Sequence, residues 1–496
     1  MIGAVTLSSC KKFLDINTDP DSIISTSPPL AQLLTSAEVN LAFEGGSDLY
    51  RYSAVIAQHL SGQASQPNQT YEYSRYNISG SDENNVWSNI FSTTLSDIEL
   101  LLQGAATTNS PYYAGIAKIL KAYEYQLVVD AWGNAPYSEA QKLTDNTRPK
   151  FDNGEDIYKN IIVLLTEAVA NLNAATSNLT PGTNSTIYTN GGNFTLAKAQ
   201  WIKLANTLKM RIFLHYSKKD PTFMVAQMNA LISSGATFMT GTADNFQMSF
   251  YAVANQTNSI HQFETNRANY LFADNRIVSL MNSKADPRRT TYFTPFPYAS
   301  SPATYKGVTP GDLTSVNFSR IHTYLRGAAS GTPTPNAQGG ITATALTYTG
   351  AAPIRMLTYA EYCFIRAEAI LKGVPAGTVP AETWFQNGIT ASMQDAGVSA
   401  TDITTYLAAN GGLTGTDPQK QQKISEEKYV ALYGVSMEPW TEYRRTGYPT
   451  LTPPSNAATP GAPVPRSLFY PQSEVDLNPN APTQKADLNQ KVFWDN

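Results

Sequence analysis

The chain of 496 residues carries 35 Lys and Arg against 39 Asp and Glu, which gives a formal net charge of −4. Such a chain has no positive field to attract phosphate backbones, which argues against nucleic acid as a partner. A hydrophobic content of 42% with 15% charged residues excludes a disordered chain and predicts a globular protein, in one large domain or two.

The beginning of the chain has the residue order of a bacterial lipoprotein processing site. An apolar stretch leads into Leu7-Ser8-Ser9-Cys10, the order apolar, small, small, Cys. The stretch is shorter than the roughly 20 apolar residues that span a bilayer. We therefore expect residues 1–20 to be a leader remnant and tether, with lipidation of Cys10, because several acyl chains anchor a protein stably. The plainer alternative is an ordinary Cys10 in a frayed terminus.

Apolar residues spaced by three and four positions predict amphipathic helices along much of the chain. The clearest patterns cover residues 112–132 and 155–172. Further helices are expected at residues 196–216, 221–233, 359–372, 384–396 and 420–433. Ala360, Cys363 and Ala367 are small residues at helical spacing, which lets neighbouring helices approach closely as in tetratricopeptide hairpins. The expected fold class is all-α, a tetratricopeptide-like superhelix of helical hairpins with few short strands and a buried thiol at Cys363.

Three segments break the helical period: residues 61–81, about 235–354, and the tail 449–496. They are rich in Gly, Pro, Thr, Asn and Tyr. Ordered loops of this length are uncommon and tend to be functional. We expect ligand contacts from these irregular segments, supported by a helical scaffold at about 27–234 and 355–448.

Two clusters in these segments combine tyrosine rings with amides and arginine. The first comprises Tyr71, Tyr73, Arg75, Tyr76 and Asn77. A sugar ring has an apolar C–H face that can lie on an aromatic ring, while each hydroxyl left unpaired on burial costs on the order of 1–3 kcal/mol. Rings together with amides therefore suit a glycan, although scattered surface tyrosines are the competing interpretation.

The second cluster lies in the insertion at about 235–354. It comprises Asn266, Arg267, Asn269, Tyr270, Tyr298 and Tyr305. Some of these rings are expected to close small cores beneath the long loops rather than to contact ligand.

Other groups with chemical potential have simpler interpretations. Trp132 and Tyr137 flank a Gly- and Pro-containing turn after a long helix, where aromatic rings usually pack the corner. The pair Arg444-Arg445 is expected to form a salt bridge with Glu438 or Glu442 rather than an anion site.

The four histidines are isolated in the sequence: His59, His215, His261 and His322. There is no zinc-ligand spacing, phosphate-binding glycine loop or nucleophile elbow. We therefore expect no metal, no cofactor and no catalytic residue.

Several blocks, in this order and spacing, resemble the SusD/RagB family of outer-membrane nutrient-binding lipoproteins. They are FLDINTDP after Cys10, VVDAWGNAPYSEA, WIKLANTLKMRIFLH, DPR at 286–288, YAEYCFIRAEAILKG, EEKYVALYGVSMEPWTEYRRTGYPTL and PRSLFYPQSEVDLNPN. The resemblance implies a single domain over residues 21–496 with four tetratricopeptide-like hairpins. It also implies a non-catalytic, surface-exposed lipoprotein of a Gram-negative outer membrane, which binds an oligosaccharide and delivers it to a SusC-like TonB-dependent transporter.

Alternatives to glycan capture stay open at this point. Some members of the family bind peptides. A surface glycoside hydrolase is an alternative of another class, because its two carboxylates are paired in space and not in sequence. A third reading is a structural or adhesive surface protein.

Overall fold

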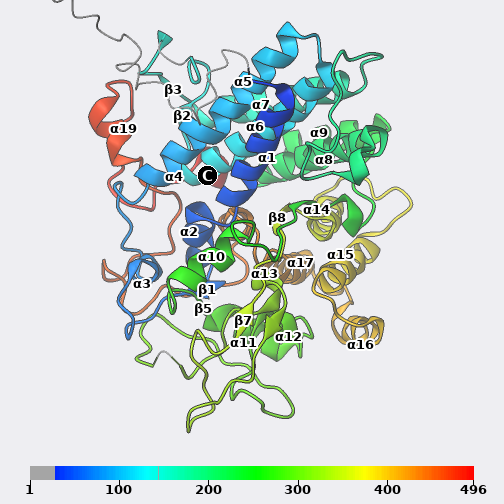
Figure 1. Ribbon diagram of the computed structural model, residues 1–496. Coiled ribbons are helices and arrows are strands. Elements are labelled where there is room, and N and C mark those ends of the chain that lie inside the picture. The colour runs from blue at the N-terminus through cyan, green and yellow to red at the C-terminus, as the bar shows by residue number, and fades with distance from the viewer. Residues whose placement is uncertain (1–27, 143–144, 315) are drawn as a thin grey trace, which may run out of the picture.

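The computed structural model describes residues 28–142, 145–314 and 316–496, which form a body dominated by helices (Figure 1). The expected tether and the lipidation of Cys10 lie outside the described residues. Among the helices described, none combines the length and the apolar character that a membrane span requires.

Seven longer helices form the N-terminal half, in the upper part of Figure 1. They are α1 (Leu30–Glu44), α2 (Asp48–Ile56), α5 (Leu95–Thr107), α6 (Pro111–Trp132), α7 (Gly154–Leu172), α8 (Phe194–His215) and α9 (Pro221–Ser233). Pro111 opens α6, where a helix needs no N–H donor, and Gly133 ends it at φ 88°. Asn153 and Asn193 cap α7 and α8 by accepting hydrogen bonds from backbone N–H groups of the first turn. Local residue chemistry thus sets where these helices start and stop.

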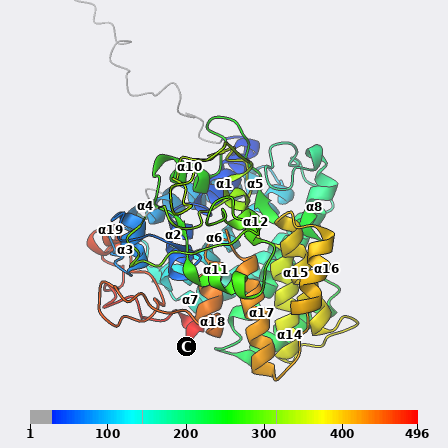
Figure 2. The same cartoon turned by 90° about the horizontal axis from the view of Figure 1, so that it is seen from below.

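The C-terminal half adds a second group of helices. They are α14 (Tyr359–Leu371), α15 (Ala381–Asp395), α16 (Ala400–Asn410), α17 (Asp417–Ala431), α18 (Glu438–Thr446) and α19 (Gln472–Leu477). The helices α14 to α18 lie near one another when the molecule is seen from below, whereas α19 lies apart from them (Figure 2). Gly388 allows α15 to approach α14, because a Cβ there would lie 2.8 Å from the ring of Phe364. The successive pairs α6/α7, α8/α9, α14/α15 and α17/α18 each pack together, as expected of tetratricopeptide-like hairpins.

The irregular segments contain short elements that tie them to the helices. These are the helices α3 (Gln69–Ser74), α4 (Asn84–Ser88), α10 (Ser259–Asn266), α11 (Asn275–Ser283), α12 (Arg289–Tyr292) and α13 (Thr323–Arg326), the π-helix η2 (Asn89–Thr94), and the 3-10 turns η4 (Asn190–Gly192), η5 (Thr242–Asp244) and η6 (Phe493–Asp495). The expectation that residues 61–81 and 235–354 lack regular structure was therefore too strong, because helices of four to nine residues carry too few positions to show a clear period.

Four two-stranded antiparallel ladders occur in the described part of the chain. They pair β1 (Leu60–Ser61) with β5 (Phe272–Ala273), β2 (Ala135–Pro136) with β3 (Phe151–Asp152), β4 (Phe246–Met248) with β8 (Ile354–Leu357), and β6 (Ala329–Ser330) with β7 (Thr347–Tyr348). The β4–β8 ladder brings the two ends of the insertion together, so the insertion leaves the scaffold and returns to it at one place.

All seven helices expected from the sequence are confirmed, each within three residues at either end. Cys363 is fully buried, and Trp132 packs in the core as expected. The main core extends from Leu30 on α1 to Trp494 near the C-terminus, so the end of the chain returns to the first helices. A smaller core around Phe364 and Phe385 lies between α14 and its neighbours.

A network of buried charges joins the helices of the two halves. Arg211 on α8 lies 2.6 Å from Glu361 on α14 and 3.5 Å from Glu438 on α18. Lys428 on α17 lies 3.2 Å from Glu442 on α18 and 3.8 Å from Glu438. These side chains are at most 5% exposed, so each charge depends on its neighbours for stabilisation.

The Arg444-Arg445 prediction holds for one of the two residues. Arg445 lies 2.7 Å from Glu442 and also pairs with Glu368. Arg444 instead donates to the backbone carbonyls of Asp130 and Arg466, at 2.6 and 2.8 Å. Arg444 therefore links α6 to the tail through peptide groups.

The buried carboxyl of Glu38 on α1 makes stability depend on pH. It accepts hydrogen bonds from the hydroxyls of Ser185 and Thr186, at 2.9 and 2.8 Å. Burial raises the pKa of Glu38 from 4.5 to about 7. The folded protein therefore binds this proton more tightly than the unfolded chain does, and the resulting stabilisation is complete below pH 4.5 and lost as the pH rises through 7.

We expect the Glu38→Gln variant to lose less stability than the wild type between pH 5 and pH 8, by up to about 3 kcal/mol. Urea unfolding at the two pH values measures this difference. Equal losses in the two proteins would show that Glu38 does not titrate in this range.

Candidate ligand-binding site

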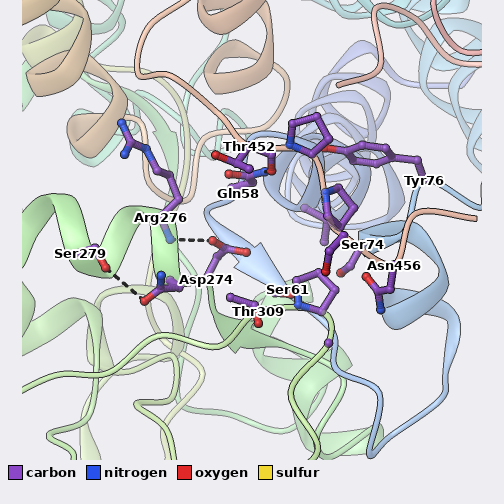
Figure 3. Close-up of a pocket in the computed structure, with 17 residues that line it drawn as sticks. Gln58, Ser61, Ser74, Tyr76, Asp274, Arg276, Ser279, Thr309, Thr452 and Asn456 are labelled. Carbon is purple, nitrogen blue, oxygen red and sulfur yellow. Dashed lines mark hydrogen bonds between the residues drawn. The ribbon is translucent and has the colours of Figure 1, made fainter. Parts of the chain in front are cut away.

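The three irregular segments meet at one hollow of about 400 Å³ (Figure 3). The β1–β5 ladder places Ser61 opposite Phe272, directly before α11. The N–H of Ala64 donates to the carbonyl of Pro310 at 3.0 Å, which attaches the loop after Val308 to the first segment. Residues 452–456 of the tail complete the wall. Segments that are far apart in the sequence thus surround one space; Gln58 and Thr452, for example, are 394 positions apart.

Asp274 and Arg276 form one side of the hollow. The carboxyl of Asp274 caps α11 by accepting the backbone N–H of Arg276 at 2.7 Å. The Arg276 guanidinium extends away from this carboxyl (Figure 3), and its buried Nε has no hydrogen-bond partner among the described residues. Burial raises the pKa of the Asp274 carboxyl well above its usual value, and the neighbouring Arg276 opposes that rise.

The tail forms the opposite side and is held in place by the first segment. Arg75 donates from Nε to the carbonyl of Asn456 at 2.7 Å, and its own carbonyl accepts the N–H of Ala458 at 2.8 Å. Gln58 donates to the carbonyl of Thr452 at 2.5 Å. The buried Oδ1 of Asn456 has no partner among the described residues, so a polar group remains unsatisfied on this side too.

Two residues of the lining have an unusual backbone conformation. Gln58 and Tyr76 have φ values of 58° and 61°, in the left-handed region that side chains other than Gly rarely adopt. Such conformations cost of order 1–3 kcal/mol each and persist where the surrounding structure fixes them, often at binding sites. Both side chains line the hollow.

The residues of the first sequence cluster have different places around the hollow. Tyr76 lines it, and Asn77 follows at the exposed surface. Tyr71 is half-buried under Arg75 and accepts a hydrogen bond from Asn456 at 3.4 Å. Tyr73 is only 1% exposed and packs on Tyr52, with ring centroids 4.7 Å apart, so it is a core residue.

The six residues of the second sequence cluster do not lie together, and only the part from Asn266 to Tyr270 lies near the first segment. Asn269 accepts a hydrogen bond from Asn68 at 3.4 Å, so the β1–β5 ladder brings this part alongside the first segment. Asn266 and Arg267 are exposed at the end of α10, and Tyr270 packs against Phe263.

The remaining two rings of that cluster lie elsewhere. Tyr298 packs in a small core with Ile341, Leu346 and Tyr348. Tyr305 is 8% exposed, with Arg289 over its ring. Neither lines the hollow, and Tyr76 is the one aromatic residue among the described residues that do.

A family model described as "Starch-binding associating with outer membrane" matches residues 21–471 of the chain. The chain belongs to the SusD-like family. No curated protein matches it.

Solved structures similar to this SusD-like chain share its fold. One, described as a chitin-binding protein, has a TM-score of 0.76 and 22% identity, covering 94% of this chain and 100% of its own. A SusD homologue from Bacteroides uniformis has a TM-score of 0.73 and 21% identity, with coverages of 94% and 99%. A chitin-binding SusD homologue from Flavobacterium johnsoniae gives 0.70 and 20%, with coverages of 94% and 97%. At these identities the likeness concerns the fold, and it confirms the tetratricopeptide-like, all-α prediction.

The polar residues of the hollow were missed by sequence reasoning. Gln58, Asp274, Arg276 and Asn456 are neither aromatic nor clustered in the sequence. Asp274 did carry one usable signal, because an Asp before an apolar-periodic run marks the start of a helix. Arg276 follows Asp274 by two positions, whereas Gln58 and Asn456 are their neighbours only through the fold.

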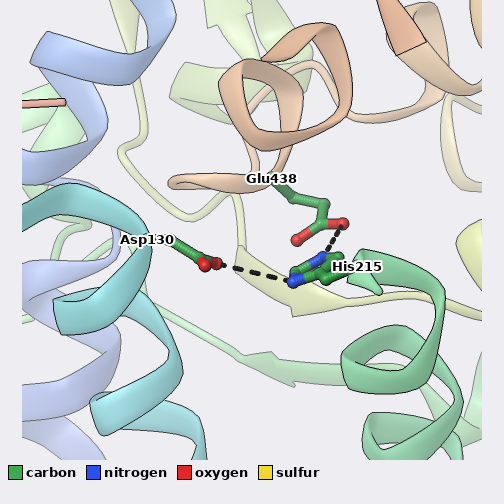
Figure 4. Close-up of side chains that lie close together, drawn as sticks. All are labelled: Asp130, His215 and Glu438. Atoms are coloured by element: carbon green, nitrogen blue, oxygen red, sulfur yellow. Dashed lines mark hydrogen bonds and ion pairs between the residues drawn. The ribbon is translucent and has the colours of Figure 1, made fainter. Parts of the chain in front are cut away.

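His215, which is isolated in the sequence, lies beside two buried carboxyl groups in the fold (Figure 4). Its Nε2 lies 3.2 Å from Glu438, and its Nδ1 lies 3.9 Å from Asp130. All three side chains are buried and are of types that can bind a metal ion. However, the hydroxyl of Tyr158 and the indole N–H of Trp494 already bind Asp130, and the Arg211 cation beside Glu438 opposes a second cation. We assign the cluster a structural role.

Proposed function

We propose that this SusD-like protein captures a neutral oligosaccharide in the hollow between α2, α11 and the tail. The observation that carries the proposal is the convergence of three distant segments on a space with unsatisfied buried polar atoms, Arg276 Nε and Asn456 Oδ1. Hydroxyl groups of a sugar can both donate and accept, so they suit this mixture of groups.

The chemistry of the lining supports a neutral ligand. Gln58, Asn275 and Asn456 supply uncharged amides, and the one carboxyl among the described lining residues, Asp274, lies beside the one guanidinium, that of Arg276. Tyr76 and the prolines of the tail supply apolar faces for the C–H face of a sugar. The descriptions of the family as starch-binding and of two structural relatives as chitin-binding support the same ligand class.

The lining also favours binding over hydrolysis. Among the described residues that line the hollow, Asp274 is the one carboxyl group. Most glycoside hydrolases use two carboxyl groups on either side of the scissile bond. We therefore propose capture without turnover.

Delivery to a SusC-like TonB-dependent transporter, from a lipid anchor at Cys10, is the further part of the proposal. It rests on the sequence resemblance and on the family's association with the outer membrane. Capture at the surface becomes useful to a cell when the ligand passes to a transporter.

Isothermal titration with chitin oligosaccharides, maltooligosaccharides and a mixed peptide library tests the ligand class. We expect one of the two glycans to bind with Kd between about 1 μM and 1 mM, because hydroxyl-rich ligands lose well-satisfied water contacts. Binding of peptides alone, or release of shortened sugars during the titration, would overturn the proposal.

A further inference from the structure

A second hollow of about 400 Å³ adjoins the first and shares Tyr76 with it. Its lining includes the half-buried ring of Phe469 and the polar side chains of Asn77, Asp487 and Asn489. This ring-and-amide mixture is the one expected for sugar recognition. Asn77 was a candidate from the sequence, whereas Phe469, Asp487 and Asn489 were not.

The tail is the common wall of the two hollows. Residues 452–456 line the first, and residues 458–463 line the second. Arg75 holds the tail at the boundary, through its bonds to the carbonyl of Asn456 and the N–H of Ala458. From Pro454 to Pro460 the chain spans at most about 20 Å, so the two spaces lie within reach of one extended ligand.

Prolines restrict the shape of the wall before any ligand binds. Pro453, Pro454, Pro460 and Pro463 each lock one backbone angle. Tyr76 keeps its left-handed conformation between the two spaces. A preformed wall lowers the entropy cost of binding a chain along it.

We propose that the two hollows are subsites of one groove, which takes a glycan chain along the tail with Tyr76 at the junction. This inference rests on the proposed function, since the first hollow must bind sugar for the second to extend it. When one end of a glycan chain is bound in the first subsite, its other end is already held close to the second. The second set of contacts therefore forms within the complex, which raises the affinity. The ligand class is thus a linear oligosaccharide rather than a single sugar or a disaccharide.

The experiment is titration with a length series, from disaccharide to hexasaccharide, of whichever glycan binds. We expect the affinity of the wild type to rise at least about tenfold along the series. Asn489→Ala and Asn77→Ala should remove most of that rise and leave disaccharide affinity unchanged. Asn77 is exposed, so its variant tests the groove even where Asn489→Ala disturbs the fold. Gln490→Ala, exposed and outside the lining, is the matched control.

The outcomes separate the two proposals. Affinity that does not depend on length, or a rise that survives both variants, would overturn the groove while leaving capture in the first hollow intact. If Asn456→Ala lowers the affinity for disaccharide but leaves the affinity for hexasaccharide at the wild-type value, long chains bind without the first hollow, which would also contradict a single groove. Absence of binding to every glycan would overturn the proposed function itself.

Discussion

Replacing Arg211 by Met is expected to lower the free energy of unfolding by about 3–5 kcal/mol. The guanidinium lies 2.6 Å from Glu361 and 3.5 Å from Glu438, and both carboxylates are at most 1% exposed. It also donates to the carbonyl of Met356 at 2.8 Å. Without it, two negative charges from different helices remain buried with one ammonium, that of Lys428, close by. Urea unfolding at pH 7 measures the loss.

Lys118→Met is the control for the Arg211 experiment. Lys118 pairs with Glu167 at 2.7 Å, yet that carboxylate is 52% exposed. Removing such a surface pair changes stability by at most about 1 kcal/mol. If Arg211→Met lowered the free energy of unfolding by no more than Lys118→Met does, the buried charge network would not be what joins the two halves of the scaffold.

Replacing Arg276 by Ala is expected to weaken oligosaccharide binding by about 10- to 100-fold, because a hydrogen bond to a charged group contributes about 1.5–3 kcal/mol. The side chain lines the hollow, where its guanidinium N–H groups can donate to a ligand hydroxyl. Titration of the wild type and the variant with the same oligosaccharide gives the ratio.

Arg267→Ala is the informative comparison, because Arg267 was expected from the sequence to bind ligand but is exposed at the end of α10, outside the hollow. We expect its affinity to equal that of the wild type. A strong effect of Arg267→Ala together with none of Arg276→Ala would move the site to the surface beside Asn269.

The helical scaffold could be predicted from the sequence because the residues that determine a helix are close together in the chain. Apolar residues in α6 and α7 repeat every three or four positions, and caps such as Asn153 stand directly before the helix that they start. Each signal lies within one segment. Short elements such as α3, with six residues, carry too few positions to show a period.

The site could be predicted only as a set of segments. The composition of residues 61–81, 235–354 and 449–496 marked the parts of the chain that surround the hollow. Which side chains face it depends on the β1–β5 pairing and on the Arg75 contacts with the tail, both of which join distant residues. Tyr73 is an example of what the sequence cannot distinguish. A tyrosine in a polar segment can be buried in the core, as Tyr73 is, or lie at the surface, and the surrounding residues are of the same types in both cases.

His215 is a second example, in which residues that are far apart in the sequence form a cluster in the fold. It stands alone in the sequence, yet the packing of α6, α8 and α18 brings it to Asp130 and Glu438. Contacts between helices depend on tertiary packing, and a single sequence read by itself contains no record of it.

A crystal structure of the protein with a bound oligosaccharide tests the central claim most directly. We expect sugar rings between Asp274, Arg276 and Asn456, with the chain continuing past Tyr76 toward Asn489. Sugar bound at the exposed end of α10, with the hollow still filled by solvent alone, would contradict both the site and the groove.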